Sequence, residues 1–267
     1  MKQVKSRDAE IGYEVLGSGP PVVLLHPFPA NHEFWLPAAQ ALVSRYQVLL
    51  PGLRGHGDSA LGDGPATMAK HAADLVEVLD QEHIRRALLA GVSIGGYVLF
   101  EFWRKSSDRV AGLVLANTKA QADTAAGRAT RLEAAAKVME QGTEPFFESM
   151  LPRLLGETTR KARPDLVQGA LGMMQKMSPE DVAMVQRGMA ERQDSVEILG
   201  TIHVPTLVVT GEEDVLTGVG DAQLIERHIP GSQMKVVAKA GHYSAWEQPG
   251  EVGKMLRQFV DSVGTFE

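Results

Sequence analysis

The chain begins with alternating apolar and polar positions and then changes to short apolar runs. Ile11, Tyr13 and Val15 alternate with polar or small residues before a break at residues 17–20, which predicts a strand or a hairpin. The later runs do not alternate. They are short, mostly aliphatic and bounded by Gly, Pro or polar residues, as strands buried on both faces would be. Four such runs are residues 22–25, 48–50, 87–90 and 110–116, and residues 206–209 and 234–237 add two more.

Segments with helical spacing separate these runs. Apolar residues recur on one face over residues 68–79 and again over residues 252–263, which predicts two amphipathic helices. Strands that alternate with helices form a parallel sheet covered by helices on both faces. The sequence therefore predicts an α/β fold with a doubly wound, mostly parallel sheet.

The alternation of strands and helices stops between residues 119 and 200. Ser178 followed by Pro179 predicts an N-cap and a first helical position in this stretch. Apolar residues recur there at helical spacing: Ala125, Ala129, Leu132, Ala136 and Met139. We therefore expect a helical cap, residues 119–200, inserted between two parts of an α/β core, residues 1–118 and 201–267.

Composition and charge exclude several classes of partner. The net charge is −6 and no basic run exceeds the cations of residues 160–163, so nothing predicts binding to nucleic acid or to an anionic membrane. The chain starts without the apolar stretch of a signal peptide, and no window approaches the ~18 apolar residues of a membrane span. We therefore expect a cytoplasmic protein. The 267 residues include no cysteine, which excludes disulfides, zinc–thiolate sites and thiol nucleophiles.

One serine lies at a tight turn between a predicted strand and a helix. Residues 91–95 fit the pattern G-x-S-x-G, with a helix expected to begin near Tyr97. The two glycines of the pattern permit a turn that strains the backbone of Ser93 and leaves no room for side chains on either side. We predict that Ser93 is a nucleophile. The alternative is that Gly95 and Gly96 only allow a close contact between helix and strand.

A serine hydroxyl needs a base to take its proton, and the base needs a carboxylate to orient it. His242 and Asp214 each follow a predicted strand, at the end of the sheet where open α/β sheets bind ligands. We predict that His242 is the base and Asp214 the acid. Glu212 and Glu213 are alternatives because they neighbour Asp214, and Asp123 is another.

The other histidines have ordinary interpretations. His71, His83 and His228 fall on or beside predicted helices with polar neighbours, so we expect them to be solvated. His203 precedes a predicted strand. No pair has the spacing of metal ligands, so we expect no metal site.

The loop after the run at residues 22–25 is a candidate oxyanion hole. Two backbone N–H groups aimed at the developing charge typically supply ~10²- to 10³-fold each. Ile94 follows the nucleophile, and Phe28 is the one donor in residues 27–29 because proline has no N–H. The alternative is a rigid proline-rich loop without a catalytic part.

Together these pieces resemble the α/β-hydrolase superfamily over nearly the whole chain. The matching motifs are residues 25–29, 53–59, 91–96, 205–211 with Asp214, and 241–242, in the chain order Ser, Asp, His. The segment at residues 91–96 is most similar to small esterases, 3-oxoadipate enol-lactonases and haloperoxidase-like perhydrolases. Three positions depart from the usual pattern: Pro27 replaces a glycine, Gly52 an aspartate and Gly218 a proline.

The resemblance implies a serine hydrolase that cleaves a small carboxylic ester or lactone through an acyl-enzyme, without metal or organic cofactor. A carbon–carbon bond hydrolase with the same triad and a slow-turnover small-molecule sensor of the same fold stay open as alternatives. We expect Phe146, Phe147 and His26 to line the substrate pocket. The seven methionines and near-balanced charge of the cap favour an apolar acyl or ring group and offer no clamp for a polyanion.

Overall fold

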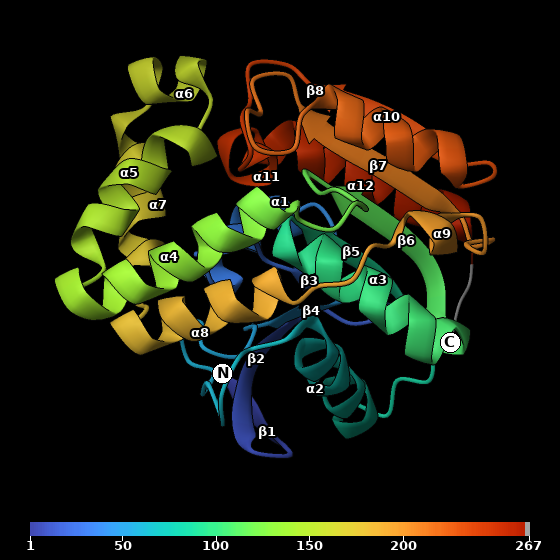
Figure 1. The fold of residues 1–267 in the computed structure, drawn as a ribbon. Helices are drawn as coiled ribbons and strands as arrows, with labels where there is room; N and C mark the ends of the chain where they lie inside the picture. The colour runs from blue at the N-terminus through green and yellow to red at the C-terminus, as the bar shows by residue number, and fades with distance from the viewer. Residues whose placement is uncertain (265–267) are drawn as a thin grey trace.

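The computed structural model describes residues 1–264 and contains one eight-stranded sheet within them (Figure 1). The strand order is β1-β2-β4-β3-β5-β6-β7-β8, with β1, β2 and β4 paired antiparallel and the remaining neighbours parallel. The doubly wound, mostly parallel sheet is therefore confirmed. The strands are β1 (Lys2–Ser6), β2 (Ala9–Leu16), β3 (Pro21–Leu25), β4 (Gln47–Pro51), β5 (Ala87–Val92), β6 (Val110–Ala116), β7 (Thr206–Gly211) and β8 (Gln233–Val237).

Helices cover both faces of this sheet. Figure 1 shows α2, α3 and α10 in front of the strands and α12 behind them. The helices outside the stretch between β6 and β7 are α1 (Leu36–Ala39), α2 (Met68–Gln81), α3 (Ile94–Ser106), α10 (Val219–His228), α11 (Ser244–Glu247) and α12 (Pro249–Val263). Short 3₁₀ turns lie at His32–Trp35 and Ser107–Arg109. The second part of the predicted core comprises residues 201–267. Its last residues, 265–267, lie outside the described residues.

Six helices lie between β6 and β7, where the sequence predicted a helical stretch. Helix α4 packs along α8, while α9 lies beside α10 and apart from the group formed by α4–α8 (Figure 1). The side chain of Ser178 caps α8 and is paired reciprocally with Asp181. The six helices are α4 (Ala125–Gln141), α5 (Glu144–Leu154), α6 (Glu157–Ala162), α7 (Pro164–Met174), α8 (Pro179–Ala190) and α9 (Val196–Leu199).

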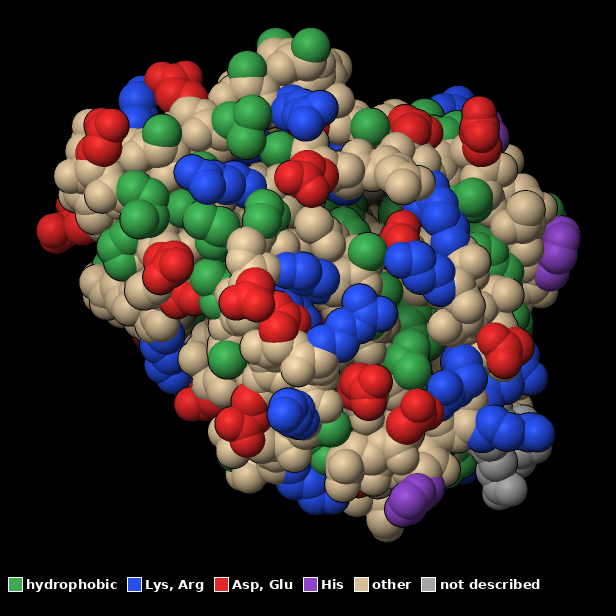
Figure 2. Space-filling view, turned by 60° about the horizontal axis from the view of Figure 1, so that its bottom comes forward, with side chains coloured by type: hydrophobic (Ala, Val, Ile, Leu, Met, Phe, Trp, Pro, Cys, Tyr) green, Lys and Arg blue, Asp and Glu red, His purple; other side chains and the backbone are tan. Residues whose placement is uncertain are grey.

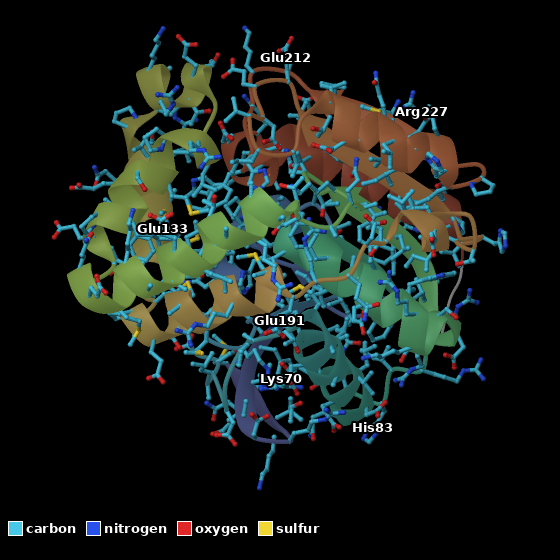
Figure 3. The ribbon with its side chains drawn as sticks, viewed as in Figure 1. Lys70, His83, Glu133, Glu191, Glu212 and Arg227 are labelled. Carbon is cyan, nitrogen blue, oxygen red and sulfur yellow. The ribbon has the colours of Figure 1, made fainter. Side chains whose placement is uncertain are left out.

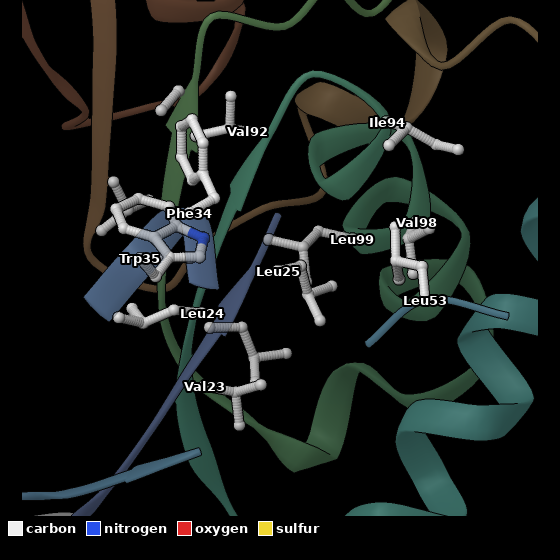
Figure 4. Packing of buried hydrophobic residues seen from close by; sticks show 14 of the residues in the cluster. Val23, Leu24, Leu25, Phe34, Trp35, Leu53, Val92, Ile94, Val98 and Leu99 are labelled. Atoms are coloured by element: carbon white, nitrogen blue, oxygen red, sulfur yellow. The ribbon is translucent and has the colours of Figure 1, made fainter. Parts of the chain in front are cut away.

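The apolar core lies between the central strands and the helices on either face. Figure 4 shows Leu24 and Leu25 of β3 packed with Val98 and Leu99 of α3 and with Trp35. All residues of β3, β5 and β6 are buried, because each of these strands has a neighbour on both sides and helices on both faces.

Three details differ from the sequence prediction. Helix α3 begins at Ile94 and not near Tyr97, because the glycines that follow Ser93 form its first turn. Strand β8 is mostly exposed, since it is an edge strand that pairs with β7 alone. The apolar stripe expected to be buried on α4 faces solvent, with Leu132 44% and Met139 52% exposed, because the opposite face of the helix packs on α8.

The face shown in Figure 2 carries acidic and basic side chains interspersed, without a continuous basic patch. No helix in residues 1–264 is both long enough and apolar enough to cross a membrane.

One histidine expected in solvent lies inside the protein. His71 is 1% exposed because it lies on the inner face of α2, and His26 and His56 are also buried, with ring centroids 5.0 Å apart. Burial disfavours the charged imidazolium, so the pKa of His56 falls to about 4 and the pKa values of His26 and His71 lie well below the ordinary value.

These buried histidines predict that the protein loses stability in mild acid. The unfolded chain takes up their protons near pH 6.5, whereas the folded chain does so only at lower pH. The free energy of unfolding should therefore be greatest above about pH 6.5 and fall toward pH 4. Each buried histidine should contribute about 1.4 kcal/mol to this fall for every pH unit. Urea unfolding followed by circular dichroism at several pH values measures this slope. The variant His71→Leu should reduce it, with exposed His228→Gln as control, and an unchanged slope in His71→Leu would contradict the account.

Candidate active site

Ser93 lies between β5 and α3 in a strained conformation, as the sequence predicted. Its φ of 55° is in the left-handed region that side-chain-bearing residues rarely adopt. Its N–H donates to Ala116 O at 3.0 Å, and its carbonyl accepts from Thr118 Oγ1 at 2.8 Å. A Cβ at Gly91 would come within 2.6 Å of Gly95 O, and one at Gly95 within 2.7 Å of Leu25 O. The turn therefore requires glycine at both positions.

His242 and Asp214 form a buried pair at the carboxyl ends of β8 and β7. His242 Nδ1 lies 3.0 Å from Asp214 Oδ2, and both side chains are almost fully buried. A carboxylate can only accept, so Nδ1 carries the proton and donates it, which leaves Nε2 as the basic nitrogen. The two residues that the sequence assigned as base and acid are thus brought together.

Four further donor groups hold the carboxylate of Asp214. Asn117 Nδ2 and Thr217 Oγ1 each donate to Oδ2 at 2.8 Å, while the backbone N–H groups of Leu216 and Thr217 donate to Oδ1 at 2.8 and 3.0 Å. The sequence reasoning missed both side chains. Asn117 could have been found because it directly follows β6, at the same edge of the sheet as Ser93 and Asp214.

The electrostatics of Asp214 favour its charged form. Burial by itself raises the pKa of this carboxyl group, but the attraction of His242 and the hydrogen bonds from His242, Asn117 and the Thr217 N–H outweigh it. The pKa therefore lies well below its ordinary value. A carboxylate that stays ionised can keep the imidazole in one tautomer and stabilise the imidazolium.

Ser93 and His242 open into one cavity of about 320 Å³ between the sheet and the helices that follow β6. Phe28, Tyr97, Leu216 and Thr217 contribute to its wall from the sheet side. Residues 119–200 supply the rest: Lys119, Asp123, Gly127, Thr130, Arg131, Ala134, Phe146, Ser149, Met150, Arg153, Gln186 and Met189.

This wall combines apolar and charged side chains. Charges are nearly balanced over the whole stretch, but three of its cations, Lys119, Arg131 and Arg153, line the cavity together with one of its acidic residues, Asp123. Of the methionines, only Met150 and Met189 line the cavity. The sequence prediction of an apolar acyl or ring group stays a prediction, and the near-balanced charge of the stretch did not indicate that Lys119, Arg131 and Arg153 would lie at one cavity.

The amides proposed for the oxyanion lie beside the cavity. Phe28 lines it directly, and Ile94 follows Ser93 as the first residue of α3. Among residues 1–264, neither N–H has a hydrogen-bond acceptor. Both N–H groups therefore lack a protein acceptor within these residues.

The three predicted pocket residues occupy different places. Phe146 lines the cavity and packs against Phe28, with ring centroids 6.1 Å apart. Phe147 is 1% exposed and packs inside the helical layer, away from the cavity wall. His26 does not line the cavity either. It is fully buried, and its ring bridges Pro27 O and the N–H of Leu53, at 3.0 and 2.9 Å, which anchors the loop that carries Phe28.

The alternative acids face other partners. Glu212 accepts from Lys239 N on an exposed loop, where Figure 3 labels it. Glu213 accepts from the backbone N–H of Thr158 at 2.8 Å. Asp123 lines the cavity but is paired with Arg131 and Arg192. Asp214 alone of the four is bonded to a histidine.

No group of three or more His, Asp or Glu side chains within residues 1–264 could hold a metal ion.

Comparisons with known proteins give one consistent result. A family model described as the alpha/beta hydrolase fold matches residues 20–249. An esterase structure from Thermogutta terrifontis is similar over 99% of both chains, with 34% identity and a TM-score of 0.95. The structure of Est816, described as an N-acyl homoserine lactone degrading enzyme, covers 97% of this chain and 100% of its own, with 28% identity and a TM-score of 0.80. 3-Oxoadipate enol-lactonase 1 of Acinetobacter baylyi is 27% identical over 92% of this chain and 90% of its own.

Proposed function

Because the chain belongs to the α/β hydrolase fold family, we propose that it is a serine hydrolase of small carboxylic esters or lactones. The observation that carries the proposal is the convergence, at one cavity, of a serine on a strained turn and a histidine paired with a buried carboxylate. The names of the esterase and lactonase relatives support the ester or lactone bond as the target.

The proposed reaction has two steps. Ser93 Oγ attacks the carbonyl carbon while His242 Nε2 takes its proton, and the same proton then passes to the departing alkoxide. The product of this step is an acyl-enzyme on Ser93. A water molecule next attacks the acyl carbon, again giving its proton to His242, and the acid leaves as Ser93 regains its hydroxyl. Asp214 stabilises the imidazolium in both steps.

The oxyanion of each tetrahedral intermediate would bind to the amides of Phe28 and Ile94. Their lack of an acceptor in residues 1–264 supports this role, because donors already in place need no reorganisation when the charge develops. His26 supports it indirectly, by fixing the loop of Phe28 through the N–H of Leu53.

We also propose that the helices after β6 form a substrate-selecting cap. Residues 119–200 supply most of the cavity wall, whereas Ser93, Asp214 and His242 all come from the sheet. Helix α9 lies beside α10, so we assign it to the core. The proposed cap is therefore shorter than the predicted residues 119–200 and comprises α4–α8 and the loop that precedes them. The core then comprises residues 1–118 and the segment from about 191 onward. A layer in this position excludes water from the nucleophile.

The two adjacent phenylalanines of α5 provide a test of the cap. Phe146→Ala should enlarge the cavity and shift kcat/KM toward bulkier esters, modestly for each carbon because one buried methylene contributes about 0.8 kcal/mol. Phe147→Ala should instead lower the free energy of unfolding by about 3–5 kcal/mol, since its ring is buried in packing. Kinetics on an ester series and urea unfolding measure the two effects. An unchanged order of substrates in Phe146→Ala would contradict the cap's role.

The proposed function is tested by assaying purified protein on short-chain esters, lactones and vinylogous diketones. We expect multiple turnovers on esters or lactones that disappear in Ser93→Ala. Turnover confined to the diketones would identify a carbon–carbon bond hydrolase. Tight binding with less than one turnover per hour would indicate a sensor, and either result would overturn the proposal.

A further inference from the structure

The cavity wall carries an excess of positive charge that the proposed chemistry does not use. Lys119 Nζ and Arg192 Nη2 lie 3.6 and 3.0 Å from Asp123 Oδ1, and Arg131 Nε donates to Asp123 Oδ2. One carboxylate thus faces three cations. Arg153, exposed on α5, is a further cation of the cavity wall and has no ion pair within residues 1–264.

Asp123 fixes one of these guanidinium groups at the edge of the cavity. Burial raises the pKa of Asp123, but the hydrogen bond and charge of Arg131 and the charge of Arg192 outweigh it and lower the pKa to about 2. Arg131 Nη1 also donates to Gln186 Oε1 at 3.1 Å. The remaining nitrogen, Nη2, has no partner within residues 1–264 and is not buried. The side chain is therefore held in place with donor capacity left over.

The other cations near the cavity are less available. Arg192 is almost fully buried and stacks over the Tyr97 ring, 4.1 Å from its centroid. Lys119 is paired with Asp123, and its charge also acts on the carboxyl group of Asp221, where it lowers the pKa against the effect of burial. The two positive groups open to a ligand are thus Arg131, which is anchored, and Arg153, which is unpaired.

We propose that the substrate carries a carboxylate in addition to its scissile ester or lactone, and that Arg131, assisted by Arg153, binds this carboxylate. This inference rests on the proposed function and specifies its substrate class. Guanidinium groups bind carboxylates through charge-assisted hydrogen bonds, which are stronger where water is partly excluded. A neutral ester would leave the excess positive charge of the wall without a counterion. The preferred substrates are therefore monoesters or lactones that retain a free carboxylate, such as those of short dicarboxylic acids.

Two esters of equal length test the proposal. Methyl hydrogen glutarate and methyl pentanoate differ by a carboxylate in place of a methyl group at the end of the acyl chain. We expect kcat/KM at least tenfold higher for the glutarate monoester, and we expect Arg131→Leu to lower this ratio about tenfold to hundredfold. Arg153→Leu, which removes a side chain without ion pairs, should lower it less. Arg128→Leu makes the same charge change on the exposed side of α4, outside the cavity, and is the matched control.

The outcomes separate this inference from the proposed function. A wild-type ratio at or below one, or an unchanged ratio in folded Arg131→Leu, overturns the carboxylate site even if Ser93-dependent hydrolysis persists. Binding of methyl hydrogen glutarate to Ser93→Ala, measured by calorimetry, needs no turnover. Suppose that the wild-type protein hydrolyses neither ester, so that the proposed function fails. Binding to Ser93→Ala that weakens tenfold or more when Arg131→Leu is added would then still support the carboxylate site. If Arg131→Leu does not fold, Arg153→Leu gives the test, and an unchanged ratio there overturns the proposal.

Discussion

Replacing Ser93 with alanine is expected to lower kcat for the best ester substrate by about 10⁶-fold. The loss is this large because the covalent route disappears entirely, whereas the oxyanion donors of Phe28 and Ile94 and the cavity itself are kept. The residual rate should remain about 10³- to 10⁴-fold above the uncatalysed reaction, because binding and the donors still act. Steady-state kinetics with a sensitive chromogenic ester measures the loss.

The matched control is Ser149→Ala. Ser149 also lines the cavity, but its hydroxyl donates to Phe146 O within α5. This variant removes the same atom from the same cavity and should keep most of the wild-type kcat. A Ser93→Ala protein that folds and retains even a tenth of the wild-type rate would remove Ser93 from the mechanism.

Asp214→Asn should lower kcat by about 10⁴-fold with the fold intact. Asparagine keeps the size of the side chain, but its NH₂ group can donate to His242 Nδ1, which would favour the tautomer with its proton on Nε2. That tautomer cannot accept the proton of Ser93. The amide also gives no charge to balance the imidazolium. The measurement is kcat across pH 6–9, with circular dichroism to establish folding.

Asp123→Asn is the natural comparison, because Asp123 lines the cavity and was an alternative acid. Its partners are Arg131, Arg192 and Lys119, so its loss should act mainly on KM for a charged ester. If Asp123→Asn lowered kcat by orders of magnitude and Asp214→Asn did not, the acid would have to be assigned to Asp123.

Much of the fold follows from the sequence because buried parallel strands leave an unambiguous signal. Residues 87–90 and 110–116 are continuous apolar runs, and both lie within fully buried strands. The positions of Ser93, Asp214 and His242 follow from the same signal, since each lies within five residues after a predicted strand, and the carboxyl ends of parallel strands share one edge of the sheet.

Helix packing and charge placement could not be predicted in the same way. Periodicity identifies α4 as a helix but does not say which face finds a partner, and Leu132 and Met139 are on the face that does not. The cavity cations were missed because a net charge summed over residues 119–200 contains no information on where Arg131 and Arg153 lie. His71 was misplaced because periodicity does not show that an amphipathic helix can bury a neutral imidazole on its inner face.

Covalent labelling with a fluorophosphonate probe tests the central claim most directly, because the reaction requires an activated serine and no knowledge of the substrate. We expect one probe per chain, located by peptide mass spectrometry on Ser93, with the reaction slowed by Asp214→Asn and abolished by Ser93→Ala. Labelling of equal extent in wild type and Ser93→Ala, or a probe found on another residue, would contradict the assignment of Ser93 as the nucleophile.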